Sequence, residues 1–484
     1  MTDACLVRAY LVALLLSCSV VSGQSTSSLI SIRSVYVDSF GDQPGASELR
    51  DQLIDVLRHS GKLQVTPLKN ADAVLGGMGA IWIRGYHSLS PRARVNDVYA
   101  EPIYGGYLSV ILKGKQGQIL WSYFVNPARA SFGENLKHNL ATQLVDRLTE
   151  AIAGETVAVP VPTDASNTPV TVQGAGATFP FPIYTEWFTS FRASNPNVLL
   201  VYDPIGSEEG FKQLIAERLD FVGSDVPVGA FEDLKPHSRL LAFPSVIGAV
   251  VLIYNLPRFG GDLRLNARTL VSMLDGHIKN WNDPAIRALN HGSSLPNRPI
   301  QVVHRSDGSG TTFALTEYLC KVSETWKHNI GQGPRVPWPV GVGANGNDGV
   351  SKVVEETPYS LGYTEFIYAF RRRLSFASIE NAAGEFIEAD LPSIAAAANY
   401  RTNPISEDFA ISLSNATGHG SYPISTFTWL VMPAQSTDPL KGRALRQFLQ
   451  WMLVAGQKQC MALGYAPLPR SIAEQEQKVV QELK

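Results

Sequence analysis

The sequence predicts an α/β protein in which a small α+β unit precedes a larger region of alternating strands and helices. From residue 171 onwards, short apolar runs alternate with amphipathic helical patterns. Residues 154–170 contain several prolines and small polar residues, so they are expected to form an extended linker between the two parts. At 484 residues the chain is also too long for one hydrophobic core. Several compact units are therefore expected.

The charge balance gives no sign of a polyanionic partner. The chain has 41 basic and 43 acidic residues, and it shows no basic block interleaved with aromatic residues. Nucleic acid is therefore not an expected partner. A small solute fits this composition better.

The first 23 residues have the pattern of a secretory signal peptide. The apolar run at 9–21 is too short to span a membrane comfortably. Cleavage after residues 21–23 is the favoured interpretation. The sequence at 15–18 also resembles a lipobox, which would leave Cys18 as a lipid anchor. The protein is thus expected in the periplasm or cell envelope, in a soluble or a lipid-anchored form.

Beyond this leader the chain has two cysteines, Cys320 and Cys460. Both lie in apolar, helix-like patterns, where a cysteine is usually a small buried hydrophobic residue. We predict that both thiols are unpaired and that no disulfide framework exists. No His/Cys cluster has the spacing of a zinc site, so neither a metal nor a cofactor is expected.

The first unit is predicted over residues 28–153. It contains, in order, an alternating strand pattern, a helix, two strand-like runs and a second helix, at residues 31–40, 46–60, 73–86, 106–125 and 135–152. This order resembles the amino-terminal domains of TolB-type envelope proteins. The resemblance implies a role in attachment or in binding an envelope partner.

The stretch QVVHRSDGSGTTF, residues 301–313, places one arginine, one acid and a Ser-Gly-Thr turn before a helix predicted over 312–326. The guanidinium of Arg305 offers a fixed fork of donors. Glycines let the backbone bend so that its N–H groups face an anion, and the dipole at a helix N-terminus favours negative charge. The pattern indicates a site for a small oxyanion, while a structural helix cap is the simpler alternative.

Two further helix starts offer the same chemistry. A strand and a glycine turn over 171–176 precede a helix that Thr178 is predicted to cap. Gly206 and Ser207 open another helix, and a strand at 220–225 then ends in an acid. Each feature alone has a structural explanation. Their combination with an arginine in one α/β region predicts a shared anion site.

Eight blocks of the second region occur in the order found in periplasmic phosphate-binding proteins of the phosphate ABC transporter. They are GAGATFPFPIYTEWF, DFVGSDVPV, FPSVIGAVVLIYN, IKNWNDPAI, HRSDGSGTTF, GANGNDGV, LGYTEF and YPISTFTWLVM. This resemblance covers about residues 172–469. It implies a two-lobed periplasmic-binding-protein fold of type II over 171–484, which closes on its ligand by hinge motion. Lobe one would comprise about 172–248 and 422–484, and lobe two about 249–421.

The resemblance also implies a set of phosphate ligands that supply hydroxyls, backbone N–H groups, a guanidinium and carboxylates. They are Thr178, Phe179, Ser207, Asp225, Arg305, Asp307, Ser309, Gly310 and Thr311. Asp307 is expected to orient Arg305. Asp225, kept ionised, would accept a hydrogen bond from protonated phosphate, whereas fully ionised sulfate has no proton to donate. We expect this carboxylate to exclude sulfate.

One feature departs from the family pattern. Glu208 and Glu209 follow Ser207, where the family has small residues. Two carboxylates in the first turn of a helix complement its dipole and would normally point into solvent. A side chain turned inward would instead repel phosphate.

The expected function is that of an exported substrate-binding protein that delivers phosphate to an inner-membrane ABC permease and its ATPase. We expect no enzymatic activity, because Ser309 has no evident base partner and neither a GxxxxGK motif nor an Asp/His metal set is present. The alternatives are a phosphate sensor or scavenger at the envelope, and a phosphatase that holds phosphate as its product.

Overall fold

The structure is a computed structural model of the whole chain. It describes residues 29–41, 45–88, 100–115, 117, 119–125, 131–132, 135–154, 170–231, 239–399, 409 and 411–482. The predicted leader and lipobox, and almost all of the predicted linker, lie outside the described residues. Within the described part of the chain, the helices are too short or too polar to cross a membrane.

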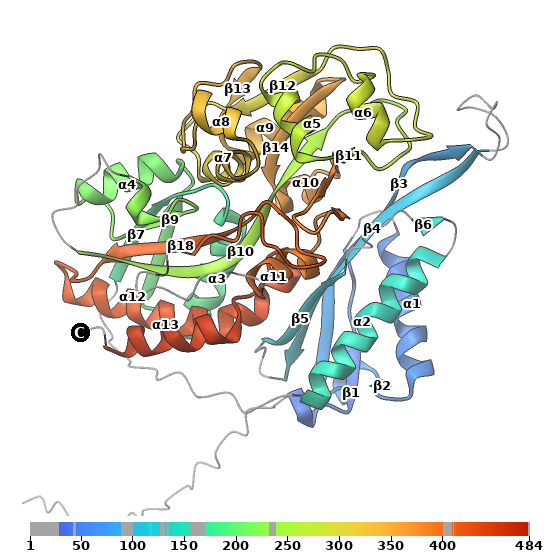
Figure 1. Cartoon of the computed structure of the whole chain (residues 1–484). Helices are drawn as coiled ribbons and strands as arrows, with labels where there is room; N and C mark the ends of the chain where they lie inside the picture. The colour runs from blue at the N-terminus through green and yellow to red at the C-terminus, as the bar shows by residue number, and fades with distance from the viewer. Residues whose placement is uncertain are drawn as a thin grey trace, which may run out of the picture.

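Two separate hydrophobic cores divide the described chain. One extends from Leu29 to Leu148 and the other from Val172 to Val480. Figure 1 shows the corresponding units, with the first in blue and cyan and the second in green to red.

The first unit is a mixed sheet covered by two helices. Its elements are η1 (Leu29–Ser31), β1 (Ser34–Val37), α1 (Ala46–Ser60), β2 (Gln64–Val65), η2 (Leu68–Asn70), β3 (Ala73–Ser88), β4 (Ala100–Gly114), β5 (Ile119–Val125), β6 (Ser131–Phe132) and α2 (Asn135–Gly154). The strand order is β2-β1-β3-β4-β5, and β6 pairs with β4. Helices α1 and α2 pack together on one face of the sheet (Figure 1).

Helix α1 has the predicted bounds because its local signals agree. Leu49, Leu53 and Leu57 recur at helical spacing and are fully buried. Gly61 ends the helix with φ of 64°, a conformation that favours glycine.

The strand-like run predicted at 106–125 is in fact two strands. β4 and β5 form an antiparallel hairpin whose register ends at Lys113 and Ile119. Gly117 adopts φ of 80°, and its N–H donates to the carbonyl of Gly114 at 2.9 Å. A glycine at this position allows the tight reversal that the alternating pattern did not reveal.

The second unit contains a nine-stranded sheet with helices on both sides. Its elements are β7 (Val170–Gly176), α3 (Phe181–Ser194), β8 (Val198–Asp203), α4 (Ser207–Ile215), β9 (Phe221–Ser224), η3 (Val228–Ala230), β10 (Leu240–Tyr254), β11 (Arg264–Leu265), α5 (Ala267–Leu274), α6 (Pro284–Leu289), β12 (Gln301–Arg305), α7 (Gly310–Val322), α8 (Glu324–Asn329), β13 (Val342–Ala344), α9 (Gly346–Glu356), β14 (Ser360–Glu365), α10 (Phe366–Arg371), β15 (Ser375–Phe376), β16 (Ser378–Glu380), β17 (Phe386–Ile387), α11 (Leu391–Asn399), β18 (Ser425–Pro433), α12 (Pro439–Trp451), the π-helical turn η4 (Met452–Gly456), η5 (Gln457–Gln459), η6 (Met461–Leu463) and α13 (Arg470–Glu482). The sheet order is β13-β12-β14-β10-β18-β9-β7-β8, with β15 beside β10.

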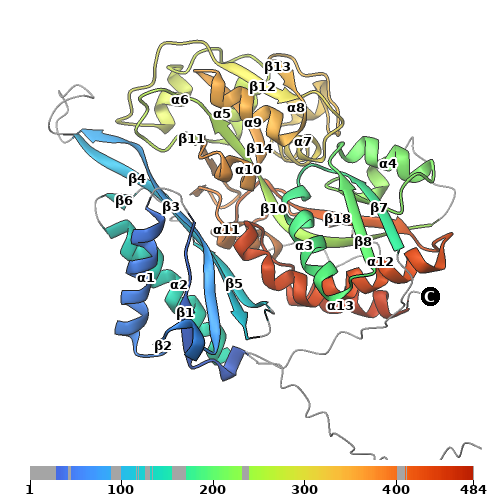
Figure 2. The same ribbon diagram turned by 180° about the vertical axis from the view of Figure 1, so that it is seen from behind.

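Strand β10 joins the two halves of this unit. Its residues 240–249 pair antiparallel with β18, and residues 250–254 pair antiparallel with β14. We call the side with β7, β8 and β9 lobe one, and the side with β12, β13 and β14 lobe two. Of the strands described, β10 is the one that pairs with strands of both lobes. The two-lobed α/β fold is therefore present, and Figure 2 shows the same division from behind.

Two predicted helices begin or end differently in the structure. Thr178 does not cap α3, which starts at Phe181 after Pro180, without a side-chain cap. The helix predicted over 312–326 is divided into α7 and α8 at Ser323. The backbone of Ser323 is extended, and its hydroxyl accepts a hydrogen bond from the N–H of Trp326 at 3.1 Å.

Cys320 lies partly exposed on α7, and Cys460 is buried between η5 and η6. Both are free thiols. Burial raises the pKa of each thiol, which favours the uncharged form.

Candidate anion-binding site

The predicted site residues lie where strands end and helices begin. Thr178 and Phe179 follow β7, Ser207 begins α4, and Asp225 follows β9 in lobe one. In lobe two, residues 305–311 connect the end of β12 to α7. The carboxyl ends of parallel strands are the usual place for ligand sites in α/β sheets.

Glycines let the loops of the two lobes approach closely. A Cβ atom added to Gly310 would lie 2.5 Å from Asp225 Oδ2 and 2.7 Å from Ser207 Oγ. A Cβ atom added to Gly206 would lie 2.9 Å from the carbonyl oxygen of Gly308. Residues of lobe one therefore touch the β12–α7 loop directly, and the lobes are closed around the site.

Arg305 is buried, with 4% of its surface exposed, and is held by hydrogen bonds at each nitrogen. Nε and Nη2 donate to the two carboxylate oxygens of Asp307, at 2.8 and 2.5 Å. Nη1 donates to Thr311 Oγ1 at 3.2 Å and to Asn347 Oδ1 at 3.3 Å. The bidentate pair fixes the plane of the guanidinium, which is the role predicted for Asp307.

The electrostatics of Asp307 support this pairing. Burial alone would raise the pKa of its carboxyl, but the hydrogen bonds and charge of Arg305 outweigh burial, so the pKa lies below its ordinary value. The N–H of Gly346 also donates to Asp307 Oδ1 at 3.1 Å. Asp307 is therefore ionised at neutral pH.

Asp225 is 1% exposed, and its two oxygens differ. Oδ1 accepts a hydrogen bond from Thr428 Oγ1 at 2.6 Å, whereas Oδ2 is buried without a hydrogen-bond partner. Burial raises the pKa of Asp225 to about 7, although Thr428 and the charge of Arg305 act in the opposite direction. The sequence predicted an ionised carboxylate, whereas this raised pKa populates the protonated and ionised forms together near pH 7.

Contacts from both lobes support the loop that carries Thr178 and Phe179. Tyr368 Oη donates to the carbonyl of Thr178 at 2.6 Å, and Tyr465 Oη donates to the carbonyl of Phe179 at 2.7 Å. The hydroxyl of Thr178 accepts from Asn347 Nδ2 at 3.0 Å. This explains why Thr178 lies in the site although it caps no helix.

The remaining hydroxyls line the closed interface. Ser309 Oγ is buried and accepts from the N–H of Thr312 at 3.1 Å, so it caps α7. Ser207 Oγ accepts from the N–H of Asp225 at 3.4 Å. The structure thus brings the nine predicted residues into one region: Thr178, Phe179, Ser207, Asp225, Arg305, Asp307, Ser309, Gly310 and Thr311.

Two residues of the site, Asn347 and Thr428, were not predicted from the sequence. Asn347 Oδ1 accepts from Arg305, from Thr311 Oγ1 at 3.2 Å and from the N–H of Glu365 at 3.3 Å, so one amide connects several site groups. Both residues lie inside the blocks GANGNDGV and YPISTFTWLVM. The signal for Thr428 was a hydroxyl in a run with the pattern of a buried strand, because a buried hydroxyl needs a hydrogen-bond partner.

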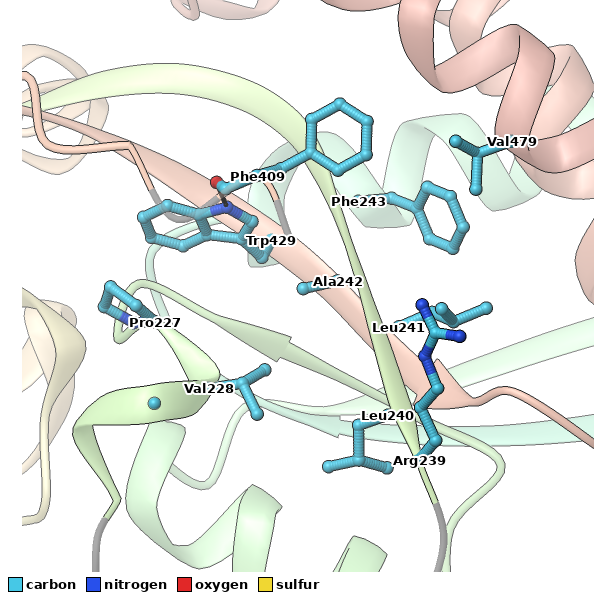
Figure 3. Close-up of a pocket in the computed structure, with 11 residues that line it drawn as sticks. Pro227, Val228, Arg239, Leu240, Leu241, Ala242, Phe243, Phe409, Trp429 and Val479 are labelled. Carbon is cyan, nitrogen blue, oxygen red and sulfur yellow. Dashed lines mark hydrogen bonds between the residues drawn. The ribbon is translucent and has the colours of Figure 1, made fainter. Parts of the chain in front are cut away.

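A separate cavity of about 520 Å³ lies in lobe one, outside this cluster (Figure 3). It is lined mainly by apolar residues of η3, β10 and β18, with Arg239 at one side: Pro227, Val228, Gly229, Arg239, Leu240, Leu241, Ala242, Phe243, Phe409, Trp429 and Val479. Neighbouring side chains of a strand point to opposite faces. Trp429 therefore lines the cavity, while Thr428 reaches Asp225 on the other side.

Among the residues that the structure describes, no group of three or more His, Cys, Asp or Glu side chains is placed to hold a metal ion. The ring of His304 stacks on Trp338, with centroids 5.2 Å apart, and its Nδ1 lies 3.0 Å from the carbonyl oxygen of Arg305.

The fold and the site together define a two-lobed solute-binding protein. Similarity to known proteins identifies the family within this class. Residues 162–455 match the family model of the PBP superfamily domain. The phosphate-binding protein PstS of Pasteurella multocida is 40% identical over 308 residues, which are 63% of this chain and 89% of that protein. PstS of Xylella fastidiosa (strain Temecula1) is 40% identical over 307 residues, 63% of this chain and 84% of that protein. The chain belongs to the PstS family of phosphate-binding proteins.

Solved structures show the same fold at lower identity. A high-affinity periplasmic phosphate-binding protein, solved with bound phosphate, is 19% identical and has a TM-score of 0.50. The match covers 64% of this chain and 93% of that one. At this identity the similarity concerns the fold alone.

Proposed function

We propose that this chain is an exported substrate-binding protein that binds inorganic phosphate between its lobes and delivers it to an ABC permease for import. The ligands are the nine clustered residues named above. The observation that carries the proposal is the buried, unpartnered Oδ2 of Asp225 in a site that also contains the guanidinium of Arg305.

This combination suits an anion that carries a proton. Arg305 and the N–H groups at the start of α7 stabilise negative charge. The free oxygen of Asp225 shares one proton with the ligand, so a phosphate oxygen and the carboxylate form a hydrogen bond instead of repelling each other. Sulfate brings no proton, and above pH 7 it meets an ionised Asp225 without compensation.

Calorimetric titration with phosphate and sulfate at pH 8 tests the proposal. We expect phosphate to bind far more tightly than sulfate, and Arg305→Ala to abolish measurable phosphate binding. Arg268→Ala, which removes an exposed arginine of α5, is the matched control and should bind phosphate like the wild type. Equal affinity for both anions in the wild-type protein would refute the assignment.

We infer that binding occurs without catalysis. Ser309 Oγ serves as a helix cap, and His304 is held by Trp338 and its neighbouring backbone, so neither has the arrangement of an activated nucleophile and base. Incubation with a generic phosphate ester, with and without divalent metal, should release no phosphate. Release that Arg305→Ala eliminates would favour a phosphatase.

The first unit is proposed to provide attachment or partner contact at the cell envelope. It has its own core, and its strand β5 contacts η5 and η6 of the second unit. Deleting residues 28–153 and measuring phosphate uptake separates a role of this unit in transport from a role in localisation or signalling. Lost uptake would link this unit to transport, while unchanged uptake would indicate that it serves localisation or signalling.

The proposed location is the periplasm or envelope, reached through the leader at residues 1–23. Mass measurement of the mature terminus distinguishes a soluble product from one acylated at Cys18. An uncleaved terminus would contradict export by this leader.

A further inference from the structure

Glu208 extends from lobe one across to the site loop of lobe two. It is the second residue of α4, and its backbone N–H donates to the carbonyl of Gly308 at 3.2 Å. Its side chain covers the α-carbon of Gly308: a Cβ atom added there would lie 2.0 Å from Glu208 Oε2. This approach requires glycine at position 308.

The carboxylate of Glu208 lies between two cations. Oε1 accepts from Lys212 Nζ at 2.5 Å, one turn further along α4, and Oε2 lies 3.5 Å from Arg335 Nε. The Glu208 side chain is 20% exposed, and Oε2 is buried without a hydrogen-bond donor. The ion pair with Arg335 therefore supplies charge compensation that no hydrogen bond provides for this oxygen.

Arg335 belongs to the opposite lobe. Its Nη1 donates at 2.8 Å to the carbonyl of Ser306, in the same loop that carries Arg305 and Asp307. Glu208 and Arg335 thus connect the two lobes at the edge of the site, whereas Lys212 is on the same helix as Glu208. Opening of the lobes separates Glu208 from Arg335 and leaves the Lys212 pair intact.

The neighbouring Glu209 has a different environment. It is exposed, and its Oε1 accepts from Gln213 Nε2 at 3.0 Å within α4. It makes a matched control, because it has the same charge in the same helical turn. Lys212 and Arg335 together also outweigh the charge of Glu208, which offsets repulsion of an anion nearby.

We propose that Glu208 is a clasp that holds the lobes closed over bound phosphate and slows its release. This inference rests on the proposed phosphate function. Because the contacts of Glu208 with Gly308 and Arg335 form on closure, they favour the closed state. Such contacts change the dissociation rate more than the association rate.

Stopped-flow measurement of inorganic phosphate association and release, followed by tryptophan fluorescence, tests the clasp. Glu208→Gln should release phosphate about two- to five-fold faster, the range expected for a partly exposed ion pair. Its association rate should change little, and its release should depend less on salt than that of the wild type. Arg335→Gln should speed phosphate release by a similar factor. The double variant should release phosphate more slowly than the two single effects multiplied together would predict.

The outcomes separate the two proposals. Wild type and Glu209→Gln should share one release rate, and if neither binds phosphate, the proposed function fails. If both bind phosphate and Glu208→Gln releases it at their rate, the clasp is wrong. Tighter binding by Glu208→Gln, or additive effects of the two substitutions, would also overturn it.

Discussion

Asp225→Asn is the substitution that separates binding from stability most clearly. The change keeps the shape of the side chain and removes its charge. The pKa of the buried carboxyl is about 7, against an ordinary value of 3.8. The difference is about 3 units, so the ionised form in the folded protein is destabilised by up to about 4 kcal/mol.

The sign of the pH dependence follows from this raised pKa. The folded protein holds the proton of Asp225 more tightly than the unfolded chain does, so this group favours folding at low pH. That advantage is lost as pH rises from about 4 to about 7. Compared with the wild type, Asp225→Asn should therefore gain about 3 kcal/mol of relative stability between pH 5 and pH 8. A new amide without an acceptor would subtract about 1–3 kcal/mol at every pH.

Thermal unfolding of phosphate-free protein at pH 5 and pH 8 measures this difference in stability. Calorimetry is the suitable method, because a protein of two units can unfold in more than one step. Glu476→Gln is the matched control. Glu476 is fully buried, both of its oxygens lack a hydrogen-bond partner, and burial raises its pKa well above the ordinary value. It should give the same pH trend but leave phosphate binding unchanged.

The binding measurement completes the experiment. Asp225→Asn should lose most of the preference for phosphate over sulfate, because a neutral amide no longer penalises a fully ionised anion. A stability difference from wild type that is the same at pH 5 and pH 8 would refute the electrostatic argument. Retained selectivity would refute the role of Asp225 in selecting the anion.

Further expected outcomes concern the groups around Asp225 and the loop of Phe179. The preference for phosphate over sulfate should weaken as pH falls below about 7, because protonated Asp225 can donate a hydrogen bond to sulfate. Thr428→Val should move this change to higher pH, because it removes a hydrogen bond that lowers the pKa of Asp225. Competition titrations with the two anions at several pH values check both expectations. Asn347→Ala should weaken phosphate binding by about 10- to 100-fold in calorimetry, since Arg305 and Thr178 each lose a partner; an unchanged affinity would contradict its positioning role. Tyr465→Phe should cost up to about tenfold in affinity through the lost bond to the Phe179 carbonyl. Thiol titration of the unfolded protein should find two reactive thiols, Cys320 and Cys460, beyond any in the leader, and finding none would contradict the free thiols.

Local signals predicted many elements of the fold. The limits of α1 follow from three leucines at helical spacing and a glycine at the end, and β9 at Phe221–Ser224 lies within the strand predicted at 220–225. The errors arose where local signals compete. A serine inside a helical pattern, Ser323, ended one helix and capped the next, and Gly117 turned one predicted strand into a hairpin.

The candidate site divides in the same way. The residue types that suit an anion were readable from the Gly-Ser-Thr turns and from Arg305. Their supporting partners were not, because they are far away in the chain: Thr428 lies 203 residues from Asp225, and Tyr465 lies 286 residues from Phe179. No spacing rule links such pairs.

The sequence by itself determined which donor groups and which acid this protein carries, the order of its strands and helices, and the family to which the chain belongs. Tertiary structure decided the charge state and the partners of these groups. Burial moved the pKa of Asp225 to about 7, which a side chain in solution would not show. Closure of the lobes placed Glu208 beside Arg335, so the effect of its charge depends on a partner that only the folded chain brings near. Both results arise because electrostatic energies depend on distance and solvent exposure, which the order of residues does not specify.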